Sequence, residues 1–221
     1  MTLLVLDLDG TLVDTIEDLR AAANRMLAAR LLAPLSGAEI RPMIGDGVAV
    51  LVERALASRG VPADASAARD YLADYQANPA GASVLFPGVR TMLDQALAAG
   101  WTLAVCTNKP VAAARTLLAS LGVAPLFAAI GGGDSFAVRK PDPGHLLGTI
   151  ALAGGDQSRA VMVGDHRNDI AAASGAGVGS IFAAWGYGAP EMADGAGAVA
   201  QSPEAVLPLA ATLLRTSSSS G

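Results

Sequence analysis

Short runs of apolar residues recur along the chain and predict buried β-strands. In the first run, residues 3–8, Asp7 is the only charged member. The runs do not alternate polar with apolar positions, which is typical of strands covered on both faces, as in a parallel sheet. The five predicted strands are Leu3–Leu8, Thr102–Cys106, Ala128–Ile130, Ala160–Val163 and Gly179–Phe182.

Helical patterns separate most of these runs. Apolar residues between positions 89 and 97 fall on one helix face, and Gly100 follows as a helix-ending residue. A second stripe of the same kind covers residues 111–121. Alternation of strands and helices at this period predicts an α/β fold with a doubly wound, mostly parallel sheet.

Residues 14–83 break this alternation, because their apolar positions show helical spacing only. Stripes around residues 19–27 and 48–56 predict two helices, and a third is expected around Ala68–Gln76. We interpret this region as a helical cap inserted after the first strand.

These patterns give a domain organisation for the whole chain. The α/β core is expected to comprise residues 1–13 and 84–215, and the cap residues 14–83. The last residues, 216–221, are a Ser/Gly-rich tail that we expect to be disordered.

Composition excludes several classes of protein. The chain is 52% hydrophobic and only 16% charged, the reverse of a disordered chain. Its formal net charge of −5 argues against a nucleic-acid binder that neutralises phosphates. Cys106 is the one cysteine, so the chain has no internal disulfide, and we expect a small buried strand residue there.

A membrane protein is also not expected. Residues 170–190 form an uncharged stretch long enough to span a bilayer, but it is rich in Ala, Gly and Ser, and glycines interrupt it. A buried helix, a turn and a buried strand explain it better. The first apolar run contains Asp7 and lacks a preceding basic segment, so we expect no signal peptide and a cytoplasmic protein. A monomer or a homodimer is expected.

Polar residues that could take part in a reaction or bind a ligand follow four of the predicted strands. In doubly wound sheets, ligands bind beyond the carboxyl ends of the strands. Asp7 and Asp9 are two residues apart, so their carboxylates face one spot, which is costly without a cation or a proton between them. The other three groups are Thr107-Asn108-Lys109, Lys140-Pro141 and Gly164-Asp165-His166-Arg167-Asn168-Asp169.

Together these groups predict a phosphoryl-transfer site. Hard carboxylate oxygens suit Mg²⁺. A cation, lysines and neutral hydrogen-bond donors suit a phosphoryl group, whose charge must be neutralised during transfer. One aspartate can act as a nucleophile and another as a proton donor.

With these four groups in this order, the chain resembles a haloacid dehalogenase superfamily phosphatase. Asp7-Leu8-Asp9-Gly10-Thr11 is similar to the first motif of that family, D-x-D-G-T. Thr107 matches the second motif, Lys140 the third, and Gly164-Asp165 with Asp169 the fourth. The resemblance covers nearly the whole chain and implies a Rossmann-like hydrolase core with a helical cap.

The resemblance also implies roles for these residues. Asp7 is the expected nucleophile, which becomes an aspartyl-phosphate, and Asp9 the expected acid and base. Mg²⁺ is expected on the Asp7 and Asp165 carboxylates and the Asp9 main-chain oxygen, with Asp169 orienting the ligands around it. Lys140 offsets the charge of Asp7 and the phosphoryl group. The expected phosphate-binding residues are Thr107 and Asn108, with Lys109 as a supporting or cap-facing contact.

In the cap, residues 40–47 resemble the corresponding segment of phosphoglycolate phosphatases. Arg41 is a candidate partner for a substrate carboxylate, and Asp46 lies in a Gly-Asp-Gly turn whose N–H groups could meet an anion. His166 departs from the family pattern, where we expect a small residue, and it either contacts substrate or shapes its loop. Two further expectations are structural: His145 should lie on a helix surface, and the glycines at 131–133 should turn the backbone.

We therefore predict a Mg²⁺-dependent phosphatase for a small phosphorylated metabolite, with 2-phosphoglycolate as the favoured substrate. A sugar phosphatase and a phosphomutase remain alternatives, since relatives with these activities share the same pair of aspartates. A non-catalytic phosphate-ligand sensor is the alternative from a different class.

Overall fold

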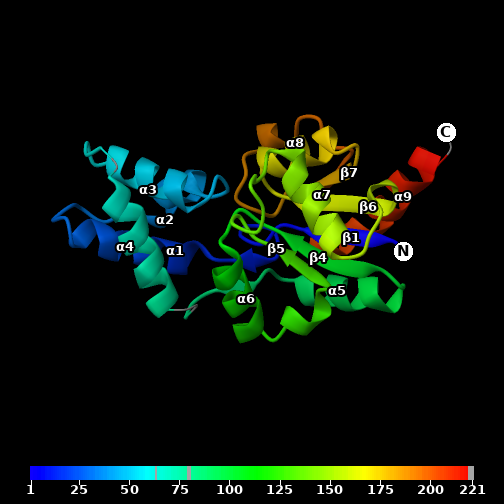
Figure 1. The fold of residues 1–221 in the computed structure, drawn as a ribbon, viewed down its shortest axis with the longest axis horizontal. Helices are drawn as coiled ribbons and strands as arrows, with labels where there is room; N and C mark the ends of the chain where they lie inside the picture. Colours follow the sequence, from blue (N-terminus) through cyan, green and yellow to red (C-terminus); the bar gives the residue numbers. More distant parts are fainter. Residues whose placement is uncertain (63, 79–80, 219–221) are drawn as a thin grey trace.

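The computed structural model describes residues 1–62, 64–78 and 81–218 and has two parts, an α/β core and a set of helices beside it (Figure 1). The chain crosses between them through a small antiparallel pair of strands, in which Val13 pairs with Leu85. This pair consists of β2 (Val13–Asp14) and β3 (Val84–Leu85).

The core contains a six-stranded sheet in the order β5-β4-β1-β6-β7-β8, and every neighbouring pair in it is parallel. The predicted doubly wound α/β fold is therefore confirmed. The short strand β8 was not predicted from the sequence. The strands are β1 (Leu3–Leu6), β4 (Thr102–Cys106), β5 (Ala129–Gly131), β6 (Ala160–Gly164), β7 (Gly179–Ala183) and β8 (Ala198–Ala200).

Helices cover both faces of this sheet, which explains why its strands are mostly apolar. Leu4 and Leu6 face the layer of α5, α6 and α9, whereas Leu3 and Val5 face α7 and α8. Neighbouring strand residues point to opposite faces, so one strand serves both cores. The helices are α5 (Val89–Ala98), α6 (Val111–Ser120), α7 (Pro143–Leu152), α8 (Arg167–Gly175) and α9 (Val206–Ser218).

The second part is helical and has an apolar cluster of its own, which includes Leu19, Met26, Leu56 and Tyr71. These residues come from three different helices, so each helix buries its stripe against the other two. We refer to this part as the cap. Its helices are α1 (Ile16–Ala28), α2 (Gly37–Ile40), α3 (Val48–Ala57) and α4 (Ala65–Ala77), with the 3₁₀ turn η1 (Arg41–Met43) before α3.

Short 3₁₀ turns join several core elements. They lie in loops that connect the strands and helices on both sides of the sheet. They are η2 (Ala124–Leu126), η3 (Gln157–Arg159), η4 (Pro190–Ala193) and η5 (Pro203–Ala205).

One expectation about a helix surface was wrong. His145, expected on a helix surface, is fully buried, because α7 packs on the sheet and on α8, and Phe136 lies against the imidazole. Cys106 is buried in β4, as expected.

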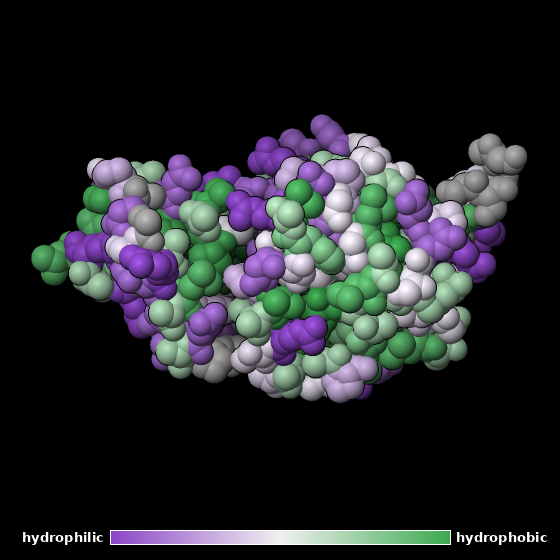
Figure 2. Space-filling model, in the orientation of Figure 1, coloured by the Kyte–Doolittle hydropathy of each residue, from purple (hydrophilic) through white to green (hydrophobic). Residues whose placement is uncertain are grey.

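At the carboxyl end, α9 extends to Ser218, so residues 216–218 of the segment expected to be disordered are helical. Residues 219–221 lie outside the described residues. Hydrophilic and hydrophobic residues are mixed over the visible face of both parts (Figure 2). Among the described residues, no helix combines the length and the apolar character that crossing a bilayer requires.

Candidate active site

The polar groups identified in the sequence meet at the carboxyl ends of β1, β4 and β6, on the side that faces the cap. Asp7 is the first residue after β1, Thr107 the first after β4, and Asp165 the first after β6. The three strands are parallel neighbours, so their ends lie along one edge of the sheet. Sequence positions far apart thus converge because the backbone direction is shared.

Three carboxylates form the centre of this site. Oxygen atoms of Asp7, Asp165 and Asp169 all lie within 4.8 Å of one another, and the three side chains are buried. Burial and the charge of Asp7 raise the pKa of Asp165 to about 6, although hydrogen bonds from the Tyr187 N–H and the Thr11 hydroxyl oppose this. Burial also raises the pKa of Asp169, against the charge of Lys140. Such a cluster is costly without positive charge.

Lys140 supplies one positive charge. Its Nζ donates hydrogen bonds to Asp169 Oδ1 and to the Cys106 main-chain oxygen, both at 2.6 Å. It also lies 2.9 Å from Asp7 Oδ1 as an ion pair, although the geometry of that contact is not that of a hydrogen bond. Burial lowers the pKa of Lys140, and the charges of Asp169 and Asp7 more than offset this, so its pKa is raised.

Two glycines permit the close approach of the carboxylates. Gly10 has φ of +90°, and a Cβ atom at this position would lie 2.3 Å from Asp165 Oδ2. A Cβ atom at Gly164 would lie 2.1 Å from the Asp169 carboxylate. Any larger residue at either position would displace a carboxylate, which explains glycine in the first and fourth motifs.

The Asp9 side chain lies apart from the carboxylate cluster and contacts Lys109 instead. Lys109 Nζ is 3.0 Å from Asp9 Oδ1 and 3.2 Å from Asp9 Oδ2. The same ammonium lies 4.5 Å from the centroid of the Tyr75 ring on cap helix α4. Lys109 therefore faces the cap and fixes the Asp9 carboxylate at the same time.

The residues that follow β4 have different hydrogen-bonding roles. The Thr107 hydroxyl accepts a hydrogen bond from the Lys109 N–H (3.2 Å), which leaves its own proton available to a ligand. The Asn108 amide nitrogen donates to the main-chain oxygens of Gly45 and Lys140, each at 3.0 Å. Both donors of Asn108 are thus occupied in holding the cap loop and the Lys140 loop to β4.

The predicted cap residues approach the site from η1 and the turn after it. The Arg41 guanidinium carbon lies 5.5 Å from the centroid of the Tyr187 ring. Asp46 pairs with Arg54 at 2.6 Å and accepts a hydrogen bond from Asn168 Nδ2 at 2.7 Å. Burial raises the pKa of Asp46, but the hydrogen bonds with Asn168 and Arg54 oppose this, and the pKa is lowered overall. The Asp46 carboxylate is therefore engaged within the protein.

His166 lies where the cap meets the core. It is the N-cap residue of α8. The imidazole Nδ1 accepts a hydrogen bond from the Asn168 main-chain N–H (3.3 Å), and the main-chain N–H of His166 donates one to Asp169 Oδ2 (3.0 Å). Burial lowers its pKa. A Cβ atom at Gly45 would lie 2.7 Å from the imidazole, so the cap loop packs directly on His166.

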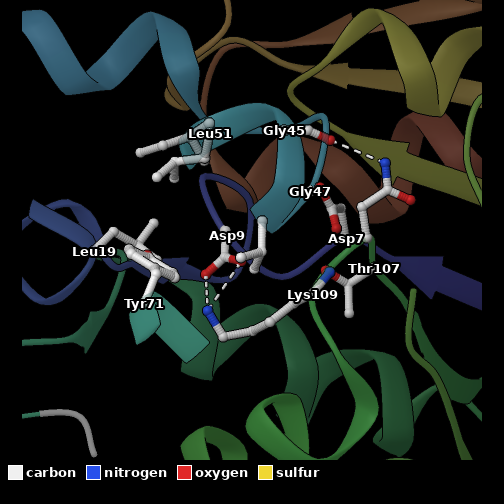
Figure 3. Close-up of a pocket in the computed structure, with 12 residues that line it drawn as sticks. Asp7, Asp9, Leu19, Gly45, Gly47, Leu51, Tyr71, Thr107 and Lys109 are labelled. Carbon is white, nitrogen blue, oxygen red and sulfur yellow. Dashed lines mark hydrogen bonds and ion pairs between the residues drawn. The ribbon is translucent and has the colours of Figure 1, made fainter. Parts of the chain in front are cut away.

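A pocket opens between these groups and the cap (Figure 3). Asp7, Asp9, Thr107 and Lys109 line its core side, and an apolar wall faces them from the cap. That wall consists of Leu19, Ile44, Val48, Leu51 and Tyr71. A smaller hollow beside it is lined by Asp9, Arg41, Gly45, Asp165, His166 and Tyr187.

Sequence reasoning missed three residues that hold the site together. The Thr11 hydroxyl donates to Asp165 Oδ1 at 2.8 Å, and its place in the first motif was a signal for it. Asn168 links Asp46 to the core and stands within the fourth polar group. Tyr187 donates its N–H to Asp165 Oδ2 at 2.7 Å. Its only signal was its position after an apolar strand.

The residues present fit a divalent cation. Three buried carboxylates offer hard oxygen ligands around one point. Among the described residues, Asp7 Oδ1 accepts no hydrogen bond, so a buried anionic oxygen remains available as a ligand. A cation at this point would also remove the repulsion that raises the Asp165 pKa.

Comparison with known proteins gives consistent matches. Residues 1–177 match a family model described as haloacid dehalogenase-like hydrolase. The chain is 46% identical to a phosphoglycolate phosphatase of Agrobacterium fabrum, over 84% of this chain and 81% of that protein. It is 43% identical to a phosphoglycolate phosphatase of Mesorhizobium japonicum, over 84% and 83% of the two chains.

A solved structure gives the same result for the fold. The crystal structure of a predicted phosphoglycolate phosphatase from Haemophilus somnus has a TM-score of 0.86 and 29% identity to this chain, covering 95% of this chain and 97% of the other. With the family model, the curated relatives and the conserved architecture in agreement, the chain belongs to the family of haloacid dehalogenase-like hydrolases.

Proposed function

We propose that the protein is a Mg²⁺-dependent phosphatase that hydrolyses a small phosphate monoester, 2-phosphoglycolate, through a covalent intermediate on Asp7. One observation carries the proposal. The Asp7 carboxylate stands beside two further carboxylates and the Lys140 ammonium, and its Oδ1 accepts no hydrogen bond from the described residues. A buried carboxylate that an ion pair with Lys140 orients at the base of a pocket is suited to attack phosphorus.

In the first half-reaction, an Asp7 carboxylate oxygen attacks phosphorus, and the bond between phosphorus and the substrate alkoxide breaks. Asp9, in its protonated form, donates its proton to the departing alkoxide and becomes ionised. Lys109 fixes the Asp9 carboxylate for this transfer by its contacts at 3.0 and 3.2 Å. The products of this step are glycolate and a mixed anhydride between Asp7 and phosphate.

In the second half-reaction, a water molecule attacks the phosphorus of the mixed anhydride. Asp9, now ionised, takes the proton of that water, and the bond between phosphorus and Asp7 breaks. Inorganic phosphate leaves, and both aspartates return to their starting states. The same residue thus serves first as acid and then as base.

Two further groups act on the phosphoryl oxygens. Lys140 offsets the combined negative charge of Asp7 and the phosphoryl group, and the Thr107 hydroxyl donates a hydrogen bond to a phosphoryl oxygen. Bound Mg²⁺, held by Asp7, Asp165 and the Asp9 main-chain oxygen with Asp169 beside them, would supply electrostatic stabilisation of the transferring phosphoryl group.

The shape of the pocket and the relatives support a small substrate. The cap covers the pocket with apolar side chains, while Lys109 lines the pocket and Arg41 lines the smaller hollow beside it. A substrate with one carboxylate close to its phosphoester, such as 2-phosphoglycolate, matches this charge pattern. The relatives with 46% and 43% identity are named phosphoglycolate phosphatases.

The test is a screen of phosphate monoesters with the wild-type protein and the Asp7→Asn variant. We expect the highest kcat/KM for 2-phosphoglycolate, loss of turnover by roughly 10⁵-fold or more in Asp7→Asn, and no turnover in excess chelator. Asp94→Asn, a change in an exposed ion pair with Arg90, is the matched control and should keep full activity.

The other outcomes are equally informative. A higher kcat/KM for hexose phosphates would contradict the proposed substrate, and transfer of phosphate to a second position of a sugar would identify a phosphomutase. Tight phosphate-ester binding without turnover under any condition would favour a sensor. Sustained turnover in Asp7→Asn or in chelator would contradict the mechanism.

A further inference from the structure

Tyr187 contacts both linkers between the core and the cap and also the cap turn η1. It follows β7 in a Gly-Tyr-Gly sequence. Its main-chain N–H donates to Asp165 Oδ2 at 2.7 Å, and the Gly188 N–H donates to the same oxygen at 3.3 Å. The backbone of this loop is therefore a direct support of the Asp165 carboxylate.

The flanking glycines permit the close approach of this loop to Asp165. A Cβ atom at Gly186 would lie 2.3 Å from Asp165 Cβ, and one at Gly188 would lie 1.8 Å from the Asp165 main-chain oxygen. In addition, Trp185 Nε1 donates to the Thr11 main-chain oxygen at 3.0 Å. Because the loop is in close contact with Asp165 on several sides, a shift of Tyr187 is also a shift of the hydrogen bonds to Asp165.

The hydroxyl end of the same residue holds the first linker to the cap. Tyr187 Oη accepts a hydrogen bond from the Thr15 N–H at 2.6 Å and donates to Asp14 Oδ1 at 2.8 Å. Thr15 is the N-cap residue of α1, the first cap helix, and it is fully buried. The start of the cap is thus tied to the tyrosine hydroxyl.

The ring of Tyr187 contacts the rest of the connection. Phe86, on the second linker, lies against it with ring centroids 6.0 Å apart and a tilt of 59°. Arg41, from the cap turn η1, lies with its guanidinium carbon 5.5 Å from the ring centroid. One side chain therefore joins both linkers and the cap turn, while its backbone holds Asp165.

We propose that Tyr187 is a positioning residue that couples the placement of the cap to the orientation of the Asp165 carboxylate, and through it to cation binding. The proposal rests on the proposed function in one respect, the assignment of Asp165 as a cation ligand. When the cap lies in its observed position, its contacts hold Tyr187, and Tyr187 holds Asp165. When a cation fixes Asp165, the same contacts hold the cap linkers.

This coupling is reciprocal by necessity. If cap placement favours cation binding by some factor, cation binding favours that cap placement by the same factor. A residue with only a packing role would lower stability when changed but would leave cation binding and linker protection independent of each other.

The variant that isolates this role is Tyr187→Phe, which keeps the ring and the backbone and removes only the hydroxyl. We expect KM to rise about tenfold, the scale of a lost hydrogen bond to a charged group, with kcat within about twofold at saturating substrate. Ser180→Ala is the matched control. It removes a buried hydroxyl from β7, the strand that precedes Tyr187, at a site that accepts a hydrogen bond from the Gly197 N–H, and it should leave KM unchanged.

A second measurement does not depend on turnover. Hydrogen exchange of the two linkers, residues 13–16 and 82–88, is followed by mass spectrometry with and without Mg²⁺, and Mg²⁺ binding is measured by calorimetry. In the wild type and in Ser180→Ala, Mg²⁺ should slow exchange of both linkers. In Tyr187→Phe, this slowing should be lost in residues 82–88, which do not contact the hydroxyl. Arg41→Gln, which removes the cap contact to the ring, should reduce the slowing as well.

The outcomes of these measurements distinguish a failure of the coupling through Tyr187 from a failure of the proposed phosphatase function. Equal slowing of residues 82–88 in Tyr187→Phe and wild type overturns the coupling, as does a change in kcat alone. Loss of the slowing in Arg41→Gln supports it even if Tyr187→Phe does not fold. A wild type that binds Mg²⁺ with linker protection but hydrolyses no phosphate ester contradicts the proposed function and leaves the coupling supported. A wild type that does not bind Mg²⁺ overturns both.

Discussion

Lys109 Nζ lies 3.0 Å from Asp9 Oδ1 and 4.5 Å from the centroid of the Tyr75 ring of the cap. Burial lowers the pKa of Lys109, but the charge of Asp9 more than offsets this, so its pKa is raised and the side chain stays cationic. One buried ammonium thus joins the acid–base candidate of the core to a cap helix. Cap placement and Asp9 orientation are therefore linked.

Lys109→Met tests this link, because it keeps the aliphatic stem and removes the charge. The Asp9 carboxylate loses its fixed orientation and its partner, so we expect kcat to fall by about 10²-fold. Steady-state kinetics with 2-phosphoglycolate measures the effect. Lys109→Arg keeps the charge and should retain more activity than Lys109→Met. Equal kcat values in Lys109→Met and the wild type would contradict the role.

Gly45 offers a test of the contact between the cap loop and the core. Its φ is +112°, and a Cβ atom there would lie 2.7 Å from the His166 ring. Gly45→Ala should therefore displace the cap loop and raise KM by about tenfold or more, since a small misplacement of substrate-positioning groups is costly.

Gly60→Ala is the matched control for Gly45→Ala. Gly60 also has positive φ, at +72°, but a Cβ atom there meets nothing within 4 Å. Both variants carry backbone strain of about 1 kcal/mol or more, so both should lose stability in urea unfolding. Only Gly45→Ala should raise KM, and a similar KM in the two variants would show that the contact with His166 is unimportant.

The sequence predicts much of the site because strand direction decides where side chains meet. Asp7, Thr107 and Asp165 each come directly after an apolar strand, and parallel pairing brings such positions to one edge. Asp169 lies in the first turn of the following helix, within reach of the same point. These placements follow from backbone topology and need no knowledge of side-chain packing.

The remainder depends on tertiary contacts that a local pattern does not contain. Tyr187 acts through its main-chain N–H, a group that every residue except proline has, and through partners 22 to 173 positions away. The Asn108 side chain could donate hydrogen bonds to a phosphate, yet its amide nitrogen donates to the main-chain oxygens of Gly45 and Lys140. His145 stands on a helix that packs on more than one side, so a single-face pattern misplaced it.

His145 makes a prediction about stability and pH. Its Nδ1 accepts a hydrogen bond from the Lys140 main-chain N–H at 3.1 Å, and burial lowers its pKa to about 4. In the unfolded chain the pKa of histidine is about 6.5. Between these values the unfolded state binds a proton that the folded state does not, so this residue makes stability fall as pH is lowered from 6.5 towards 4.

His145→Leu should therefore destabilise the protein more at pH 7.5 than at pH 5. At pH 7.5 we expect a loss of about 1–3 kcal/mol, because leucine has no acceptor and the Lys140 N–H loses its partner in a buried environment. Urea unfolding in chelator at the two pH values measures both numbers. A loss that is the same at pH 7.5 and pH 5 would contradict the assignment of a buried, neutral imidazole.

Protons and Mg²⁺ should compete for the Asp165 carboxylate. Burial and the charge of Asp7 raise the pKa of this carboxyl to about 6, against about 3.9 in an unfolded chain. Without a cation the folded state binds more protons between these values, so this residue makes stability fall as pH rises from 4 to 6. A cation that requires the ionised carboxylate reverses this trend.

Mg²⁺ should therefore raise the melting temperature strongly at pH 7.5 and little at pH 5, with an affinity that weakens up to about tenfold per pH unit below pH 6 for each proton displaced. Calorimetric titrations and thermal melts with and without Mg²⁺ at pH 5, 6 and 7.5 test this. Asp165→Asn should lose the Mg²⁺-dependent shift at all three values, whereas Asp94→Asn should retain it. A Mg²⁺ affinity independent of pH would show that the cation binds somewhere other than the buried carboxylates.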